Sequence, residues 1–312
     1  MHITCGVPQG SVLGPLLFLI YINDFINSSS IFDFHLFADD SNLFYSDKDL
    51  EHLEETVNQE LSKINTWLCA NKLSLNIDKT HFVIFHPYQK KLNYSVKIEI
   101  DDKTINQHKS VKYLGILIDC HLNWKEHIQQ ISKKISRGIG VLCKIRHYVD
   151  VKILVQLYHA IILPFFSYSC IVWGNTYEHN IKPLQIMQKK AIRLITFSDF
   201  DAHTSPLFAQ LKLLKLRDHI KLQTLYFMHQ FVTGKLPKIF DSFFTKTSDM
   251  HNVNTRFATR STFYVPKIRT NYGKFNIRYN GPILWNETDE RFKILTPYSF
   301  KRELSLHFIN FY

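Results

Sequence analysis

Residues 31–45 have the sequence IFDFHLFADDSNLFY, in which two short runs of apolar and aromatic residues flank Ala38-Asp39-Asp40. Runs of this composition predict two strands, from Ile31 to Phe37 and from Ser41 to Tyr45. The residues between the runs would then form the tip of a hairpin. The sequence therefore predicts a β-hairpin that carries two adjacent carboxylates at its tip.

The two aspartates place like charges side by side without a basic partner in the neighbouring sequence, which is unfavourable unless cations neutralise them. Successive strand residues point to opposite faces, so only one of the two can aim directly at a shared site, and Asp39 is the preferred ligand. Hard carboxylate oxygens favour Mg²⁺, and two such ions about 4 Å apart can promote an in-line phosphoryl transfer. Taken alone, an Asp-Asp pair is a weak signal, because a solvated turn has the same sequence.

The residues on either side of the hairpin predict a mixed fold. Before it, the segment Gly6–Ser11 indicates a tight loop, and Ser11 can cap an apolar helix from about Val12 to Phe25. After it, apolar residues at spacings of three and four predict a long helix from Leu50 that ends near Asn71. Further strands are predicted at Leu73–Ile77, Phe82–Phe85, Val96–Ile100 and Val111–Asp119. This order predicts an α+β domain with a mostly antiparallel sheet.

From Trp124 onward the pattern becomes helical. An apolar stripe consists of Ile128, Ile131, Ile135, Leu142 and Ile145. Lys133, Arg137 and Lys144 lie on another face of the same helix, where they could contact a phosphate backbone. Gly138 and Gly140 within the helix indicate a kink or a close backbone approach. Further helices are predicted at Val151–Val172, Pro183–Thr196 and Leu207–Val232, and beyond Thr233 the periodicity is weak.

The charge is unevenly distributed along the chain. Residues 1–80 contain four basic and eleven acidic residues, a net charge of −7, whereas the remainder carries +18. A large cationic part beside a smaller anionic one suits a protein that lies along a phosphate backbone and gathers metal ions at one place. An ordinary basic surface is the alternative.

Basic and aromatic residues alternate near the C-terminus, a mixture that could combine phosphate contacts with base stacking. Many of the aromatic residues could instead belong to the core. The basic residues are Arg256, Arg260, Lys267, Arg269, Lys274 and Arg278, and the aromatic residues are Phe257, Phe263, Tyr264, Tyr272, Phe275 and Tyr279.

The five cysteines lie at least 23 residues apart and never approach the C-x-x-C spacing of a zinc site, so no zinc is expected. The sixteen histidines are scattered as well, and none is assigned a role. Gly14 and Pro15 interrupt the longest apolar stretch, Val12–Ile22, which is too short to span a bilayer, so no membrane segment is expected.

Four motifs occur in a fixed order: GVPQGS at 6–11, FADD at 37–40, NKLSLNIDKT at 71–80 and YLGI at 113–116. In this order and at these intervals they resemble motifs B, C, D and E of reverse transcriptases. The jockey-like group of non-LTR (LINE-type) retrotransposon enzymes shares a further feature, an apolar helix that ends in Ile-Asn-Asp, as at Ile22-Asn23-Asp24. The resemblance extends with lower specificity to Lys189–Arg193 and Gly281–Asn286.

The resemblance implies roles for individual residues. Asp39 and Asp40 correspond to the catalytic, metal-binding carboxylates. Lys79 corresponds to a lysine that steadies the nucleotide phosphates or protonates the leaving pyrophosphate, although a solvated turn lysine is the alternative. Contacts with template and nucleotide would come from Pro8, Gln9, Gly10, Ser11, Phe37 and Ala38. The primer grip, a hairpin that holds the 3′ end, would comprise Tyr113, Leu114 and Gly115.

By resemblance, residues 1–118 would form a partial polymerase palm, residues 119–200 a helical thumb-like region, and residues 201–312 a C-terminal basic and aromatic region. The implied partners are an RNA template, a DNA primer and dNTPs, with Mg²⁺ as the cofactor. The implied location is intracellular, in the nucleus or the cytoplasm. The implied reaction is RNA-directed DNA synthesis by two-metal nucleotidyl transfer.

One departure from the family concerns motif A, which lies before motif B and brings another metal-binding aspartate. No acidic residue precedes Asp24, and the spare carboxylate of Asp33 has no motif behind it. We therefore expect a truncated chain that lacks the motif A aspartate and catalyses poorly. The alternative is a non-catalytic nucleic-acid-binding remnant, and the coding sequence upstream of Met1 would decide between the two. Viral RNA-dependent RNA polymerases rank third, because they carry Gly where Ala38 stands.

Overall fold

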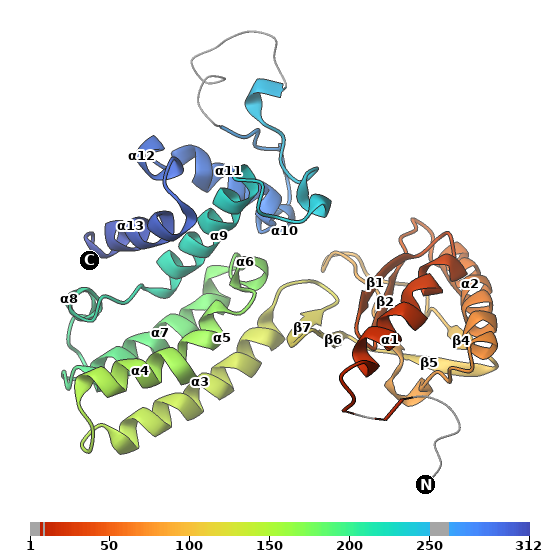
Figure 1. The fold of residues 1–312 in the computed structure, drawn as a ribbon, viewed down its shortest axis with the longest axis horizontal. Coiled ribbons are helices and arrows are strands. Elements are labelled where there is room, and N and C mark those ends of the chain that lie inside the picture. Colours follow the sequence, from red (N-terminus) through yellow and green to blue (C-terminus); the bar gives the residue numbers. More distant parts are fainter. Residues whose placement is uncertain (1–6, 9, 250–261) are drawn as a thin grey trace. The chain divides into compact units, whose positions relative to one another are not determined.

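The computed structural model describes residues 7–8, 10–249 and 262–312, and all structural statements below concern these residues. The chain divides into two compact units, Met1–Val111 and Lys112–Tyr312 (Figure 1). Helices combine with small sheets, which confirms the predicted α+β class. Gln9, Arg256, Phe257 and Arg260 lie outside the described residues.

The first unit packs one long helix and a short apolar helix against small sheets. Its helices are α1 (Gly14–Ile22), which continues as a 3₁₀ turn at Asn23–Ser28, and α2 (Leu50–Ala70). Its strands are β1 (Asp33–Phe37), β2 (Asp40–Phe44), β3 (His81–Phe82), β4 (Ile98–Ile100) and β5 (Lys103–Gln107). The core beneath them is formed by Ile22, Phe25, Phe32, Leu61, Ile64, Leu68, Val96, Ile98, Ile100 and Ile105.

The expected antiparallel sheet is replaced by three small sheets. The strands pair in the orders β1-β2, β3-β5-β4 and β6-β7, where β6 is Ser110–Tyr113 and β7 is Ile116–Asp119, and β3 runs parallel to β5. The single strand predicted over Val111–Asp119 is therefore a hairpin. Strand β5 was not predicted, although Asp101 and Asp102 both adopt the positive φ of a two-residue hairpin turn before it.

Two other predicted strands are wrong or shortened. Leu73–Ile77 has no strand, because the Asn76 side chain accepts a hydrogen bond from the Lys79 N–H and draws the chain into a 3₁₀ turn at Ile77–Lys79. Only His81 and Phe82 pair in the region predicted as the strand Phe82–Phe85. Short apolar runs of this kind are compatible with several backbone conformations.

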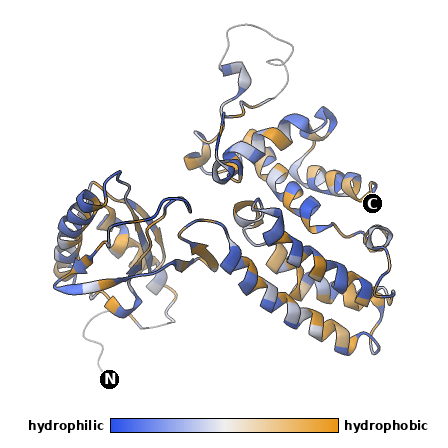
Figure 2. Cartoon of the chain, turned by 180° about the vertical axis from the view of Figure 1, so that it is seen from behind, coloured by the Kyte–Doolittle hydropathy of each residue, from blue (hydrophilic) through white to orange (hydrophobic). Residues whose placement is uncertain are grey.

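The second unit is built mainly of helices. The central ones are α3 (Lys125–Ile145), α4 (Val151–Ile161), α5 (Leu163–Ser167), α6 (Cys170–Trp173), α7 (Glu178–Ile195), α8 (Thr204–Gln210) and α9 (Leu216–Val232). Apolar and polar residues alternate around them, as amphipathic packing requires (Figure 2). Their shared core includes Ile135, Leu142, Leu154, Phe166, Trp173, Leu184 and Ile192.

Two predicted helices are divided. The helix expected at Val151–Val172 breaks into α4, α5 and α6, because Pro164 lacks an N–H donor and Ser169 adopts a positive φ. The helix expected at Leu207–Val232 divides into α8 and α9 at Lys212, which also has a positive φ. The helix expected at Pro183–Thr196 is confirmed as part of α7, which begins five residues earlier.

The C-terminal part is more regular than its sequence suggested. It contains α10 (Asn271–Lys274), α11 (Ile277–Glu287), α12 (Glu290–Lys293) and α13 (Pro297–Ile309). Trp285 and Phe300 are fully buried beside Met228 of α9. None of the described helices combines the length and apolarity that crossing a membrane requires.

Candidate functional site

The predicted acidic hairpin is present, with strand ends that differ from the prediction by one or two residues. Strands β1 and β2 pair in antiparallel register from Asp33 opposite Phe44 to Phe37 opposite Asp40. Only Ala38 and Asp39 remain for the turn, and Ala38 has a φ of 52°. Asp39 therefore lies in the turn itself, whereas Asp40 is the first residue of β2.

The two faces of the hairpin differ in character. Phe34, Leu36 and Leu43 pack against the core of the first unit. Because side chains alternate along a strand, Asp40 shares the opposite face with its cross-strand partner Phe37 and with His35. Asp39, Asp40 and Phe37 are exposed. The aspartates thus lie on the exposed side of a small sheet whose other face packs against the core.

Buried contacts hold the base of this hairpin. The Phe25 ring packs on Phe34 and on Trp67 of α2, with centroid separations of 5.3 and 4.9 Å. The buried carboxylate of Glu60 on α2 accepts a hydrogen bond from the Ser29 hydroxyl at 2.5 Å and forms an ion pair with Lys63. The hydrogen bond from Lys63, followed by that from Ser29, lowers the pKa of Glu60. Sequence periodicity could not identify Glu60, because its signal is that of any polar helix residue.

The two carboxylates have the chemistry of a cation site. The side-chain carboxylates of Asp39 and Asp40 form no hydrogen bond or ion pair among the described residues. Adjacent exposed carboxylate oxygens suit a hard divalent ion such as Mg²⁺. The described residues add no third histidine, cysteine or acidic side chain to this pair at metal-binding distance.

The loop before α1 has the expected turn geometry. Gly10 has a φ of 86°, and the Ser11 N–H donates to the Pro8 carbonyl at 3.1 Å. The Ser11 hydroxyl accepts a hydrogen bond from the Gly14 N–H at 3.1 Å, so Ser11 does serve the start of α1, which begins later than predicted. Apart from the neighbours of Gly10 in the chain, no atom of the described residues lies within 4 Å of the position that a Gly10 Cβ would occupy. The loop is therefore open on that side.

Lys79 is exposed at the end of the 3₁₀ turn that follows α2. Its backbone N–H is bound by Asn76, which fixes the direction of the chain. No hydrogen bond or ion pair within the described part of the first unit joins Lys79 to either aspartate. Its role in phosphate chemistry stays a prediction.

The turn at Tyr113–Gly115 lies in the second unit, between β6 and β7. Leu114 and Gly115 both have positive φ values, of 44° and 83°. The Tyr168 hydroxyl donates to the Leu114 carbonyl at 2.6 Å, and its ring would lie 3.6 Å from a Cβ at Gly115. This turn is therefore pinned to the helical body, a support that the sequence pattern did not reveal.

Helix α3 presents the predicted cationic face. Lys133, Arg137 and Lys144 fall within about 40° of one another around the helix and extend over about 16 Å. All three are exposed, whereas Ile135 and Leu142 on the opposite side are fully buried.

An unpredicted residue, Asp119, orients the start of this helix. Its buried carboxylate accepts hydrogen bonds from the N–H groups of His121, Asn123 and Trp124, at 3.1, 3.1 and 2.8 Å. Its sequence signal is the acidic residue before a loop that leads into a helix.

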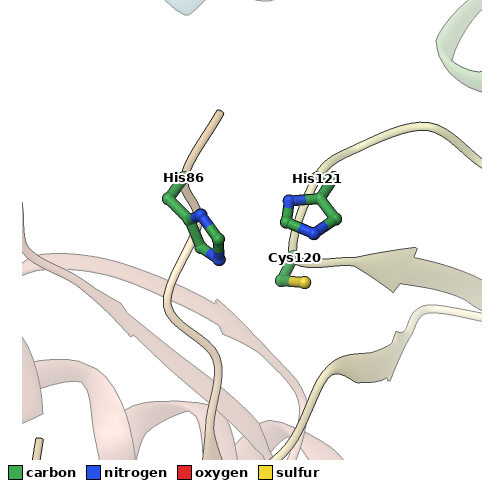
Figure 3. A group of neighbouring side chains, drawn as sticks. All are labelled: His86, Cys120 and His121. Atoms are coloured by element: carbon green, nitrogen blue, oxygen red, sulfur yellow. The ribbon is translucent and has the colours of Figure 1, made fainter. Parts of the chain in front are cut away.

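Three further side chains, from two histidines and a cysteine, are of types that can bind a metal. His86 belongs to the first unit, whereas Cys120 and His121 follow β7 in the second (Figure 3). They form no site within either unit, and they receive no role.

Comparison with known proteins finds a family match for the N-terminal part of the chain. Residues 1–118 match the family model of the reverse transcriptase (RNA-dependent DNA polymerase) domain. The chain is 27% identical over 226 residues to the probable RNA-directed DNA polymerase from transposon X-element of Drosophila melanogaster, a match that covers 70% of this chain and 25% of that protein. No solved structure is significantly similar to the chain.

Two further relatives from Drosophila melanogaster give the same result. The RNA-directed DNA polymerase from mobile element jockey is 26% identical over 230 residues, and the probable RNA-directed DNA polymerase from transposon BS is 26% identical over 233. Each match again covers 70% of this chain, which spans about a quarter of the length of these relatives. Residues 1–118 therefore match the reverse transcriptase (RNA-dependent DNA polymerase) family, in a chain that is similar over 70% of its length to polymerases of non-LTR retrotransposons.

Proposed function

We propose that this chain supplies the metal-binding hairpin of an RNA-directed DNA polymerase of a non-LTR retrotransposon. The observation that carries the proposal is the exposed Asp39-Asp40 pair at the tip of β1–β2, within the matched residues 1–118. Its substrates would be dNTPs and a DNA primer on an RNA template. It would act inside the cell, in the nucleus or the cytoplasm.

Asp39 and Asp40 would hold Mg²⁺ through their carboxylate oxygens. When bound, the metal ions would lower the pKa of a primer 3′-hydroxyl and stabilise charge on the leaving pyrophosphate. The open loop from Pro8 to Ser11, together with Phe37 and Ala38, would contact template and nucleotide. Lys79 would steady the nucleotide phosphates or give a proton to the pyrophosphate. Tyr113, Leu114 and Gly115 would hold the primer end.

The hairpin supplies only part of such a site. Since no third acidic side chain joins Asp39 and Asp40 among the described residues, we expect weak Mg²⁺ binding and little primer extension by this chain alone. Residues 1–118, placed in the longer jockey polymerase in exchange for its matching segment, should support extension of oligo(dT) on poly(rA) with dTTP. Asp39→Asn in that chimera should lower the rate by at least about a hundredfold, since one charge-stabilising group is removed.

Metal binding tests the same residues without catalysis. Titration of this chain with Mn²⁺, followed by electron paramagnetic resonance, should show a weak site that Asp39→Asn and Asp40→Asn each remove. Asp33→Asn is the matched control, because Asp33 lies on the same hairpin but opposite Phe44, at the far end from the turn. If neither hairpin-tip variant changed Mn²⁺ binding, the assignment of the metal site would be wrong.

A second candidate function is non-catalytic binding of nucleic acid. The exposed face of α3 favours it, because Lys133, Arg137 and Lys144 can neutralise phosphates whether or not metal chemistry occurs. Primer extension that depends on Asp39 favours the enzyme. Duplex binding that is indifferent to Asp39, without extension in the chimera, favours the binding protein.

A further inference from the structure

The C-terminal part of the second unit contains an open pocket of about 630 Å³. It lies between the extended segment 265–269, helix α10 and the start of α11. Lys267, Arg269 and Lys274 bring three cationic side chains to it, and Tyr279 brings an aromatic ring. The function proposed above does not use this pocket, although its basic and aromatic residues belong to the set that the sequence indicated for phosphate contacts and base stacking.

The charged side chains that line the pocket are all cationic. No acidic residue occurs in the sequence from Met250 to Asn286. Lys267, Arg269 and Lys274 are exposed, and none of them takes part in an ion pair among the described residues. Three unpaired cations around one hollow make a favourable place for an anion.

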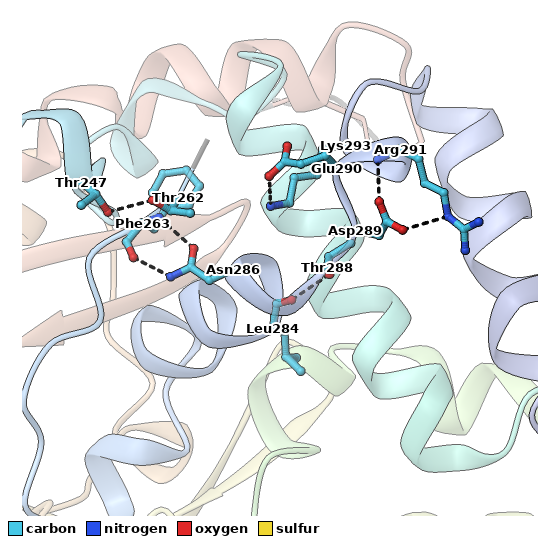
Figure 4. Close-up of polar contacts among 10 residues, drawn as sticks. All are labelled: Thr247, Thr262, Phe263, Leu284, Asn286, Thr288, Asp289, Glu290, Arg291 and Lys293. Carbon is cyan, nitrogen blue, oxygen red and sulfur yellow. Dashed lines mark hydrogen bonds and ion pairs between the residues drawn. The ribbon is translucent and has the colours of Figure 1, made fainter. Parts of the chain in front are cut away.

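The walls of the pocket are held in place. The Asn286 amide of α11 donates to the Phe263 carbonyl at 2.8 Å, and its oxygen accepts from the Phe263 N–H at 2.9 Å (Figure 4). This pair of bonds ties Phe263, two residues before the extended segment, to the helix that carries Tyr279. Across the pocket, a Cβ on Gly273 would lie 2.5 Å from the Ile268 side chain, so α10 packs directly on that segment.

Neighbouring rings reinforce this frame. Phe275, which follows α10, packs edge-on against Tyr177 at 4.8 Å, and the Arg278 guanidinium lies 4.1 Å from the centre of the Phe243 ring. These contacts fix the backbone that carries Lys267, Arg269 and Lys274, whereas the three side chains are exposed.

We propose that this pocket binds single-stranded nucleic acid, with phosphates on Lys267, Arg269 and Lys274 and a base stacked on Tyr279. A stacked base must be unpaired, which favours a single strand over a duplex. The proposal deepens the proposed function, because it adds a single-strand site to the duplex contacts of α3. The two sites lie on different elements and can be tested separately.

The test measures binding of fluorescein-labelled oligo(rU) and oligo(dT) 12-mers to the whole chain between 50 and 200 mM salt. Simultaneous Lys267→Glu, Arg269→Glu and Lys274→Glu should weaken binding of both by about tenfold or more and reduce the salt slope by about 2, at roughly 0.7 per phosphate. Tyr279→Leu should weaken binding by about fivefold or more while leaving the slope unchanged. A loss with only one sugar would restrict the site to that nucleic acid.

The matched control is the triple change Lys152→Glu, Lys182→Glu and Lys221→Glu, which alters the net charge equally at exposed positions on α4, α7 and α9. If the control weakened 12-mer binding as much as the pocket variant did, or if the pocket variant had no effect, the proposal would be overturned. An α3 variant that loses duplex binding but still binds the 12-mers would support the α3 assignment and show that the pocket binds single strands independently of α3.

A measurement on the unaltered chain guards against misfolded variants. Photocrosslinking to a 12-mer containing 4-thiouridine, followed by peptide mapping, should label residues within 262–279. Labelling confined to other segments would overturn the proposal even if every variant failed to fold.

Discussion

Helix α3 contains two glycines whose surroundings differ, and they allow a paired test of how the cationic face is supported. A Cβ on Gly138 would lie 2.9 Å from Ile162 Cγ1 and 3.2 Å from the Ile161 carbonyl oxygen, at the end of α4. Gly140, two residues later and exposed, would place its Cβ in open space. Both substitutions gain the same helix propensity, about 1 kcal/mol for Gly→Ala.

The contact with α4 therefore decides the difference. Ile162 is fully buried, so neither its side chain nor the adjacent carbonyl can move aside freely, and overpacking of this kind costs about 1–3 kcal/mol. Gly140→Ala should raise the free energy of unfolding by about 1 kcal/mol. Gly138→Ala should leave it unchanged or lower it by up to about 2 kcal/mol.

Urea unfolding, followed by tryptophan emission, measures the effect in the second unit, which contains three of the four tryptophans. At a slope of about 2 kcal/mol per molar urea, the two midpoints should differ by about 0.5–1.5 M. Ile162→Ala should lower the free energy of unfolding less in the Gly138→Ala variant than in the unaltered chain, because it removes the atom that the new methyl group meets. Equal stabilisation by both alanines would refute the close approach of α3 and α4.

Three further predictions concern nucleic-acid binding, pH and the support of the acidic hairpin. Replacing Lys133, Arg137 and Lys144 together by Glu should weaken binding of an RNA–DNA duplex by about tenfold or more and reduce the salt slope by about 2 to 3. In the same anisotropy titration, Asp39→Ala should change neither the affinity nor the slope. Intact binding in the triple variant would contradict the assignment of α3 to a thumb. Burial lowers the pKa of His127 and of His219 to about 4, below the unfolded value of about 6.5, so the unfolded chain binds more protons between these values and stability should fall as pH falls from 6.5 to 4. Each histidine should lower the free energy of unfolding by about 2 kcal/mol at pH 5. His219→Gln, whose amide can still donate to the Ser167 hydroxyl, should remove part of the pH dependence of the urea midpoint. An unchanged pH dependence in this variant would contradict the burial argument. Glu60→Ala should leave the Ser29 hydroxyl without its acceptor and lower the stability of the first unit by about 1–3 kcal/mol. Hydrogen exchange should then be faster in β1 and β2 but not in α3. Protection equal to that of the unaltered chain would show that Glu60 does not support the hairpin.

Local patterns in the sequence were sufficient to predict those elements whose structure depends on residues a few positions apart. The β1–β2 hairpin, helix α2 and the two faces of α3 were predicted because strand and helix periodicity require only residues a few positions apart. The four motifs pointed to the reverse transcriptase domain for a related reason, since each motif is a short contiguous segment.

Tertiary structure decided the features that join distant parts of the chain. Sequence spacing could not reveal the parallel pairing of β3 with β5, the Glu60–Ser29 bond or the anchoring of Leu114 by Tyr168, because their partners are 25 to 54 residues apart. The C-terminal pocket shows the same limit. The sequence supplied its basic and aromatic residues, but only the packing of Gly273 on Ile268 and of Asn286 on Phe263 brings them around one hollow. The sequence determines which residue types are present, whereas their proximity depends on burial and hydrogen bonds between residues far apart in the chain.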